Sequence, residues 1–302
     1  SYNFNIINFN TEKRKMCSYL AMSSNKVAIV TGANKGLGFA LVKELCDKLD
    51  GIVYLTSRDE KRGIEATEKM KQLGYYAKYH QLDVGNTDSV VKLTSSICKE
   101  EQIVDILINN AGILFLKDAK ESKYVQAEQT ILINFTALVN FTEAMLPFIA
   151  DGGKIVNISS SSGHLSRIPS EQLRAKISSP NLTLKELQSL MNDYLEAVKV
   201  NKDIEDGWGD SPYVVSKVGV NAYTFLLNRR LANRGIKVDC VHPGYVISDM
   251  TRGSGNVSPE EAAKVVVKVA LDSENGGRYF WHNGDVVPWD GSDPRGYIDG
   301  RK

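Results

Sequence analysis

The 302-residue sequence lacks the features that mark disulfide-rich, membrane-spanning and metal-binding proteins. Its four cysteines are widely spaced and form no Cys-x-x-Cys pair, which favours reduced thiols over a disulfide framework and gives no reason to expect a metal site. Residues 17–22 are too short and too polar for the apolar part of a signal peptide. No apolar run approaches the roughly 18 residues needed to cross a bilayer. We therefore expect a cytoplasmic protein without a membrane segment.

An excess of charge is also missing. The chain has 37 basic and 36 acidic residues, for a net charge of +1 at pH 7, so nothing indicates a nucleic acid or an anionic membrane as a partner. Hydrophobic residues make up 42% and charged residues 24%, which is typical of a globular protein with a substantial core. Residues 1–24 are rich in asparagine and have no periodicity. We expect them to be a disordered leader or an extension added for expression.

From residue 25 onward, short apolar runs alternate with stretches of helical periodicity. β-Branched and apolar strands separated by helices indicate a parallel sheet covered on both faces. Residues 25–302 should therefore form one α/β, doubly wound (Rossmann-like) domain of about seven parallel strands. The expected strands are 26–30, 52–56, 77–84, 105–109, 154–159, 236–241 and 278–281, and the expected helices are 39–49, 60–73, 89–101, 123–148, 213–233 and 258–271.

The alternation is interrupted at about residues 164–212. Leucine, methionine, tyrosine and valine side chains between 182 and 198 predict a helix pair with an apolar face, and residues 206–212 read as a loop. This segment is a helical insertion that leads directly into the next predicted helix.

A glycine-rich turn follows the first strand and opens the first helix. In this position backbone amides and a helix N-terminus can hold a pyrophosphate, and the glycines allow a tight turn and close approach of the phosphate. The turn therefore predicts a dinucleotide site, with contacts from Gly32, Asn34, Lys35, Gly36, Leu37 and Gly38.

The end of the second strand indicates which dinucleotide binds. Arg58 offers a guanidinium fork suited to a 2′-phosphate, and Lys35 adds a second cation. An NAD-binding protein usually places a carboxylate here for the ribose 2′-hydroxyl, and a one-residue shift of the strand end would give Asp59 that role. We predict NADP(H).

The ends of the third and fourth strands should lie along the same edge of the sheet. Asp83 and Val84 are candidates for contact with adenine. Asn110, Ala111 and Gly112 follow the fourth strand, and small residues there would let the cofactor pass close to the backbone.

Tyr213 and Lys217 are four positions apart, so a helix would place them on one face. A tyrosine has a pKa of about 10 in water, and a nearby cation moves that pKa toward neutrality. The pair is therefore a candidate proton donor with its electrostatic partner.

The order of these motifs resembles the short-chain dehydrogenase/reductase family, from residue 27 to about residue 250. The resemblance rests on the glycine turn, residues 109–112, the serine after the fifth strand, the tyrosine–lysine pair and Pro243-Gly244. It implies that Tyr213 exchanges the proton and that Lys217 binds the nicotinamide ribose and lowers the tyrosine pKa. It also implies that Ser159 positions the carbonyl oxygen, that Asn134 supports a relay water, and that the cofactor meets Pro243, Gly244, Val246 and Ser248.

Within the family the chain resembles the monomeric carbonyl reductases. Residues 34–36, 56–59, 80–83 and 126–128 have that appearance, as does the gap of 54 positions between residues 159 and 213. In relatives with a short gap, the tyrosine helix commonly forms an oligomer interface. Here the insertion should cover that surface, so we expect a monomer.

Other positions depart from that subgroup. His242 and Tyr245 flank Pro243-Gly244 in place of cysteine and tryptophan, and Ser161 is polar where the subgroup has a larger apolar residue. Ser161, Trp208 and Tyr245 are the candidate substrate contacts, although Trp208 serves equally well as a packing residue of the insertion. Four successive serines at 159–162 leave room for another assignment, but Ser159 best fits the strand end.

The sequence thus predicts an NADPH-dependent reductase of small aldehydes, ketones or quinones. The alternatives are an enzyme of the same family dedicated to one compound, such as a pteridine, steroid or prostanoid, and a non-catalytic NADP-sensing protein.

Overall fold

A computed structural model describes residues 26–100 and 103–293; the predicted leader at residues 1–24 lies outside this part. One eight-stranded sheet forms the centre, with strand order β3-β2-β1-β4-β5-β6-β7-β8. The strands are β1 (Lys26–Val30), β2 (Gly51–Ser57), β3 (Lys78–Gln81), β4 (Val104–Asn109), β5 (Ile149–Ile158), β6 (Lys237–Val241), β7 (Tyr279–Phe280) and β8 (Val286–Val287).

Strands β1 to β7 pair in parallel, as predicted. The chain runs outward from β1 to β3, then returns and continues with β4 on the other side of β1. Ligands of such sheets bind at the carboxyl ends of the strands beside this reversal. The prediction missed only β8, which is antiparallel to β7, because two residues are too few to show a periodic pattern.

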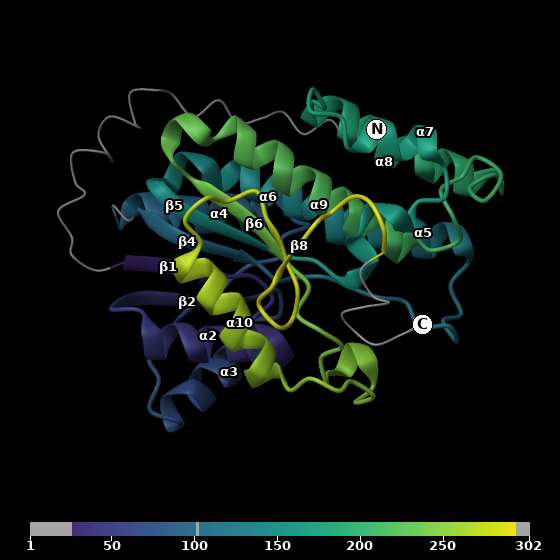
Figure 1. Cartoon of the computed structure of the whole chain (residues 1–302). Coiled ribbons are helices and arrows are strands. Elements are labelled where there is room, and N and C mark those ends of the chain that lie inside the picture. The colour runs from purple at the N-terminus through teal and green to yellow at the C-terminus, as the bar shows by residue number, and fades with distance from the viewer. Residues whose placement is uncertain (1–25, 101–102, 294–302) are drawn as a thin grey trace.

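Side chains alternate between two cores, one on each face of the sheet. In β1, Ala28 and Val30 face one core while Val27 and Ile29 face the other. The first face carries α2 (Gly36–Lys48), α3 (Glu60–Gln72) and α10 (Pro259–Asp272). The second carries α4 (Thr87–Lys99), α5 (Lys123–Ile131), α6 (Leu138–Met145) and α9 (Pro212–Arg230) (Figure 1).

The insertion consists of α7 (Glu171–Ile177) and α8 (Leu184–Lys199) and lies outside α5 and α9 (Figure 1). The apolar face of α8, including Leu187 and Tyr194, is buried. An ion pair joins Lys123 of α5 to Asp203, with 2.6 Å between Nζ and Oδ2, and Asp203 is only 1% exposed. The insertion therefore covers the tyrosine helix, as predicted.

Residues 123–148 form one helical stretch that contains a π-helical turn at Leu132–Ala137 and ends in a 3₁₀ turn at Leu146–Phe148. Its 26 residues are long and apolar enough to cross a bilayer by length and composition alone, a feature that the sequence reading did not find. Its most apolar window is 56% buried, and α5 and α6 pack on α9 and α4, as core helices do.

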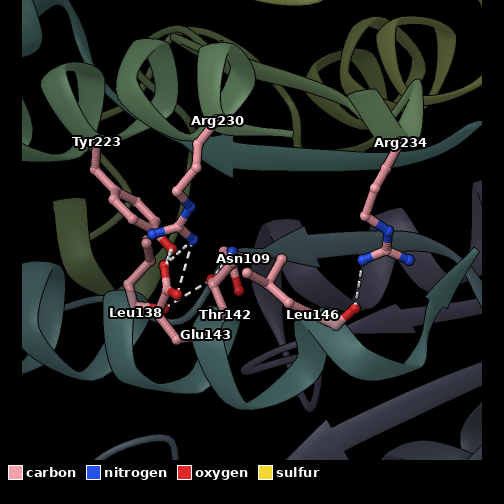
Figure 2. A network of polar contacts seen from close by, with 8 residues as sticks. All are labelled: Asn109, Leu138, Thr142, Glu143, Leu146, Tyr223, Arg230 and Arg234. Carbon is pink, nitrogen blue, oxygen red and sulfur yellow. Dashed lines mark hydrogen bonds and ion pairs between the residues drawn. The ribbon is translucent and has the colours of Figure 1, made fainter. Parts of the chain in front are cut away.

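Figure 2 shows the polar network that joins α9 to α6. Tyr223 donates from Oη to Glu143 Oε1 over 2.7 Å, and Arg230 contacts both carboxylate oxygens at 2.6 and 2.8 Å. Asn109 of β4 donates to Thr142 of α6 over 2.9 Å. The contacts of Tyr223 and Arg230 with Glu143 fix the C-terminal half of α9, while its N-terminal end reaches the sheet edge where the predicted site lies.

Candidate active site

The glycine turn (residues 31–38) joins β1 to α2 in a conformation that only small residues permit. Gly32 and Gly36 have φ values of 63° and 54°, in the left-handed region that favours glycine. A Cβ on Gly38 would lie 2.4 Å from the carbonyl oxygen of Gly32 and 2.6 Å from Asn110 Nδ2. The glycine spacing is thus explained by backbone geometry and by close packing of the helix on the turn.

Hydrogen bonds of Asn110 and Thr31 join this turn to the residues that follow β4. Asn110 Nδ2 donates to the carbonyl oxygens of Thr31 and Gly32 over 2.9 and 3.1 Å. The Thr31 hydroxyl accepts from the backbone amides of Asn110 and Ala111 over 2.9 and 3.0 Å. Asn110 and Ala111, predicted as cofactor contacts, therefore also fix the glycine turn, a role that the sequence did not reveal.

The N-terminus of α2 receives no hydrogen bond from a capping side chain, and its first turn holds no acidic residue. Its backbone amides and the positive end of its dipole therefore suit an anion. The Lys35 ammonium pairs with Asp249 over 2.5 Å, with both side chains largely exposed. Because exposed ion pairs contribute little stability, a phosphate can compete for Lys35.

The end of β2 separates the two cofactor alternatives. The strand ends at Ser57, and Arg58 is exposed. Asp59 instead caps α3: its carboxylate accepts from the backbone amide of Arg62 over 2.9 Å and contacts that guanidinium at 3.3 Å. The carboxylate that would have favoured NAD is therefore occupied, and the residue left at the strand end is a cation.

The remaining predicted cofactor residues lie at the ends of neighbouring strands. Asp83 and Val84 follow β3, and the Asp83 carboxylate accepts from the backbone amide of Gly85 over 3.0 Å. A Cβ on Gly112 would lie 3.2 Å from Asn134 Oδ1. Beyond β6, Gly244 has a φ of 89°. Pro243 and Val246 are buried there, and Ser248 packs over the glycine turn, 3.9 Å from the position of a Gly36 Cβ.

Tyr213 and Lys217 lie side by side in the first turns of α9. Ser211 caps this helix and Pro212 opens it. The Lys217 ammonium lies 5.6 Å from the centre of the Tyr213 ring and donates to the carbonyl oxygen of Ile158 over 2.8 Å. The two side chains share one helix face, as the spacing predicted, and that face meets the end of β5.

Burial governs the pKa values of this pair. It lowers the pKa of Lys217 to about 8, because the loss of water around the ammonium disfavours its charged form. The amine therefore stays mostly protonated at neutral pH and loses its proton as the pH rises through about 8. Burial raises the pKa of Tyr213, and a side-chain hydrogen bond with Ser160 lowers it by less. The net shift of the Tyr213 pKa is therefore upward, and its lowering by Lys217 stays a prediction.

Ser160, rather than Ser159, is the serine beside the tyrosine, which corrects the prediction. The Ser159 side chain is 2% exposed, and its hydroxyl donates to Asn221 Oδ1 over 2.6 Å, away from Tyr213. Ser160 is half-buried and hydrogen-bonds to Tyr213. Strand alternation carried the missed signal: Ser159 shares a face with Asn157, and both side chains point toward α9.

Asn134 lies in the π-helical turn, with its side chain held by the neighbouring backbone. Its Oδ1 accepts from the amide of Ile113 over 2.8 Å, and its Nδ2 donates to the Ile113 carbonyl oxygen over 2.9 Å. Nδ2 also lies 3.2 Å from the Ser216 hydroxyl, which donates to the carbonyl oxygen of Tyr213 over 2.8 Å. The side chain therefore supports the tyrosine turn, and its predicted relay role stays a prediction.

The three candidate substrate residues have different surroundings. Tyr245 is 45% exposed and its hydroxyl bonds to Ser254 over 2.6 Å. Ser161 is half-buried in the turn after β5. Trp208 is only 3% exposed and packs edge-on against Tyr194 at 5.6 Å between ring centres. Trp208 is therefore a packing residue of the insertion, which leaves Ser161 and Tyr245 as candidates.

A family model for short chain dehydrogenases matches residues 26–171 and 204–257. The chain belongs to the short-chain dehydrogenase family. The matched residues of this short-chain dehydrogenase include the glycine turn, Ser160, Tyr213 and Lys217. The unmatched residues 172–203 hold α8 and most of α7, so the additional element relative to the family model is the helical cover on α5 and α9.

The curated relatives include proteins named as NADPH carbonyl reductases. The chain is 38% identical over 275 residues to carbonyl reductase (NADPH) 1 of Mus musculus, an alignment that covers 88% of this chain and 99% of the relative. It is 39% identical over 255 residues to carbonyl reductase (NADPH) 3 of Rattus norvegicus, an alignment that covers 82% of this chain and 92% of the relative.

Solved structures resemble the chain over most of its length. Salutaridine reductase from Papaver somniferum has a TM-score of 0.77 and 30% identity and covers 85% of this chain and 99% of its own. Menthone neomenthol reductase from Mentha piperita has a TM-score of 0.73 and 29% identity, and the match covers 86% of this chain and 99% of the reductase.

Proposed function

We propose that this protein reduces carbonyl groups of small molecules with NADPH. The observation that carries the proposal is the meeting of Tyr213, Ser160 and Lys217 at the carboxyl ends of β4 to β6, beside an uncapped helix N-terminus. The relatives named as NADPH carbonyl reductases, which match 82–88% of this chain, support it. The exposed Arg58 and the occupied Asp59 favour NADPH over NADH.

The cofactor supplies the hydride, and the protein supplies position and a proton. Ser160 and Tyr213 donate hydrogen bonds to the substrate oxygen, on which negative charge grows as the carbonyl carbon is reduced. Tyr213 then transfers its phenolic proton to that oxygen. Because burial alone would hold this proton tightly, and because the single Ser160 hydroxyl proton is donated to the substrate oxygen, the charge of Lys217 must stabilise the phenolate that remains.

The main alternative is a reductase dedicated to one compound. It is favoured by the similar solved structures of salutaridine reductase and menthone neomenthol reductase, whose names each specify one kind of substrate. The exposed apolar side chains of Tyr245, Ile247 and Met250 lie in the segment after β6 that borders the cofactor turn. They suit apolar substrates, whether the enzyme accepts many carbonyl compounds or only one.

The test is NADPH oxidation across quinones, diketones, aldehydes, ketones, steroids and pteridines, with wild type, Tyr213→Phe and Tyr223→Phe. We expect activity on several carbonyl compounds, and a fall in kcat of about 10²- to 10⁴-fold for Tyr213→Phe. Tyr223 is a matched control because it lies on the same helix and bonds to Glu143, away from the site.

Turnover of a single compound would select the dedicated reductase. Full activity of Tyr213→Phe would refute the assigned proton donor. Binding of NADPH with no turnover of any carbonyl would support the non-catalytic alternative.

We also propose that the protein is a cytoplasmic monomer. The insertion occupies the outer surface of α5 and α9, and the cysteines of the described residues, Cys46, Cys98 and Cys240, are unpaired thiols. Sedimentation should give one species of about 33.4 kDa; a dimer that persists on dilution would contradict this proposal.

A further inference from the structure

The serine turn (residues 159–163) is bridged by one buried amide from α9. Asn221 is 0% exposed. Its Oδ1 accepts from the Ser159 hydroxyl over 2.6 Å, and its Nδ2 donates to the carbonyl oxygen of Gly163 over 2.9 Å. These bonds join the first and last residues of the turn, so the amide holds both sides of the segment that carries Ser160.

A second donor reaches the same carbonyl from the C-terminal segment. Trp289 Nε1 donates to the Gly163 oxygen over 2.8 Å, while the Trp289 carbonyl accepts from the amide of Leu165 over 3.0 Å. The Trp289 ring packs on Phe225 of α9, with 5.0 Å between ring centres. Tyr279 Oη donates to the carbonyl oxygen of Ser160 over 2.7 Å. Backbone groups on both sides of the serine are thus fixed.

Close packing surrounds Gly163, the last residue of this turn. A Cβ on Gly163 would lie 2.6 Å from Ser159 Oγ, 2.7 Å from Asn221 Nδ2 and 3.0 Å from the carbonyl oxygen of Lys217. The turn therefore lies directly against α9. Along that helix Tyr213, Lys217 and Asn221 are spaced by four residues and so lie along one face. One helix face thus presents the tyrosine and its cation and also anchors the serine turn.

We propose that Asn221 is a positioning residue of the reductase site: it sets the place of Ser160 relative to Tyr213, and Trp289 assists by holding the same Gly163 carbonyl. The proposal rests on the reductase function proposed above. Asn221 touches neither substrate nor cofactor in this role and acts only through the serine turn.

Loss of the Asn221 amide would leave the buried Ser159 hydroxyl without its acceptor and the Gly163 carbonyl with one donor fewer. A buried hydroxyl without a partner is costly, so the turn would shift to satisfy it. A displacement of about 1 Å at a catalytic group can lower a rate about a hundredfold. The predicted effect is therefore on kcat, because the glycine turn that binds the cofactor is held by other residues.

A double-mutant cycle of Asn221→Ala and Ser160→Ala is the test. We expect Asn221→Ala to lower kcat about 10- to 100-fold with the NADPH dissociation constant within about threefold of wild type. In the Ser160→Ala background the same change should cost less than about threefold, because the group being positioned is already gone. Asn228→Ala is the matched control. Asn228 also lies on α9, and its Oδ1 accepts from the backbone amide of Val238 over 3.0 Å, away from the site.

Equal losses from Asn221→Ala in both backgrounds, or an equal loss of kcat from Asn228→Ala, would overturn the positioning role. If Asn221→Ala does not fold, Trp289→Phe keeps an aromatic ring at this position and removes one donor, and its smaller loss of kcat should likewise vanish in the Ser160→Ala background. A wild-type protein that reduces no carbonyl, or a fully active Tyr213→Phe variant, would instead refute the proposed function, so the two failures are distinguishable.

Discussion

The glycine turn and the serine turn leave the same edge of the sheet, and each is held by the side chain of one asparagine. Asn110 binds two carbonyl oxygens of the glycine turn. Asn221 binds a hydroxyl and a carbonyl oxygen of the serine turn. The difference lies in what each turn presents. The glycine turn leads into an uncapped helix whose amides are available to an anion, whereas the serine turn presents the Ser160 hydroxyl to Tyr213.

The supports of the two turns also come from different parts of the fold. Asn110 follows β4, the strand that pairs with β1, so sheet topology alone brings it to the glycine turn. The serine turn depends on α9 and on residues 279 and 289 near the C-terminus. A cofactor turn can thus be built from adjacent strands, while a catalytic turn that must match a tyrosine on a helix is fixed by that helix.

The largest expected effect separates the two serines of the serine turn. Ser160→Ala should lower kcat about 10²- to 10³-fold, because one of two donors to the developing oxyanion is lost. Ser159→Ala should lower it less than about tenfold, because its hydroxyl serves only the bond to Asn221. The measurement is steady-state kinetics with saturating NADPH on a carbonyl substrate of the wild type.

Ser162→Ala is the control for polarity lost nearby, since that residue lies in the same run of serines. If Ser159→Ala proved as inactive as Ser160→Ala, the functional distinction between the two serines would be lost.

A second test adds a methyl group to each turn. Gly38→Ala should weaken NADPH binding about tenfold or more and cost about 1–3 kcal/mol of unfolding free energy, because the new Cβ would contact backbone of the glycine turn at 2.4 Å. Gly163→Ala should lower kcat with little change in NADPH affinity, because its Cβ would press on Ser159 and Asn221. Cofactor titration, turnover and denaturant unfolding of both variants would separate the two effects.

Gly74→Ala is the control for backbone strain without a steric clash, since nothing lies within 4 Å of its Cβ position but a φ of 84° disfavours an L side chain. The comparison of the turns would fail if Gly38→Ala and Gly163→Ala changed NADPH affinity and kcat alike.

The smallest expected effect concerns the cations around the glycine turn. Arg58→Gln should weaken NADPH binding about 10-fold, the cost of one charge-assisted hydrogen bond to phosphate, and leave NADH binding nearly unchanged. Lys35→Gln should have a smaller effect, because Lys35 must first leave Asp249. Binding titrations with both cofactors would measure these ratios, and equal losses for NADPH and NADH would show that Arg58 does not meet the 2′-phosphate.

Much of the fold could be predicted because local periodicity agreed with the final packing. β1 was predicted at its observed bounds, and the α10 prediction of 258–271 differs from Pro259–Asp272 by one residue at each end. β3 was predicted too long, since the apolar and polar pattern continues beyond Gln81 although pairing with β2 stops there. The periodicity of apolar residues reports which positions are buried, whereas the end of a strand is set by where its pairing with the neighbouring strand stops.

The sequence by itself determined the chemistry: the glycine spacing, the tyrosine–lysine interval and the cation after β2 each have a local physical reason. Tertiary structure decided which groups those residues meet. It placed Ser160, not Ser159, beside Tyr213, buried Trp208 against Tyr194, and brought Asn221 and Trp289 to one carbonyl oxygen. Spacing within one helix or turn fixes which way a side chain points. A hydrogen-bond partner 62 or 126 residues away along the chain comes within reach only when sheet, helix and C-terminal segment pack together.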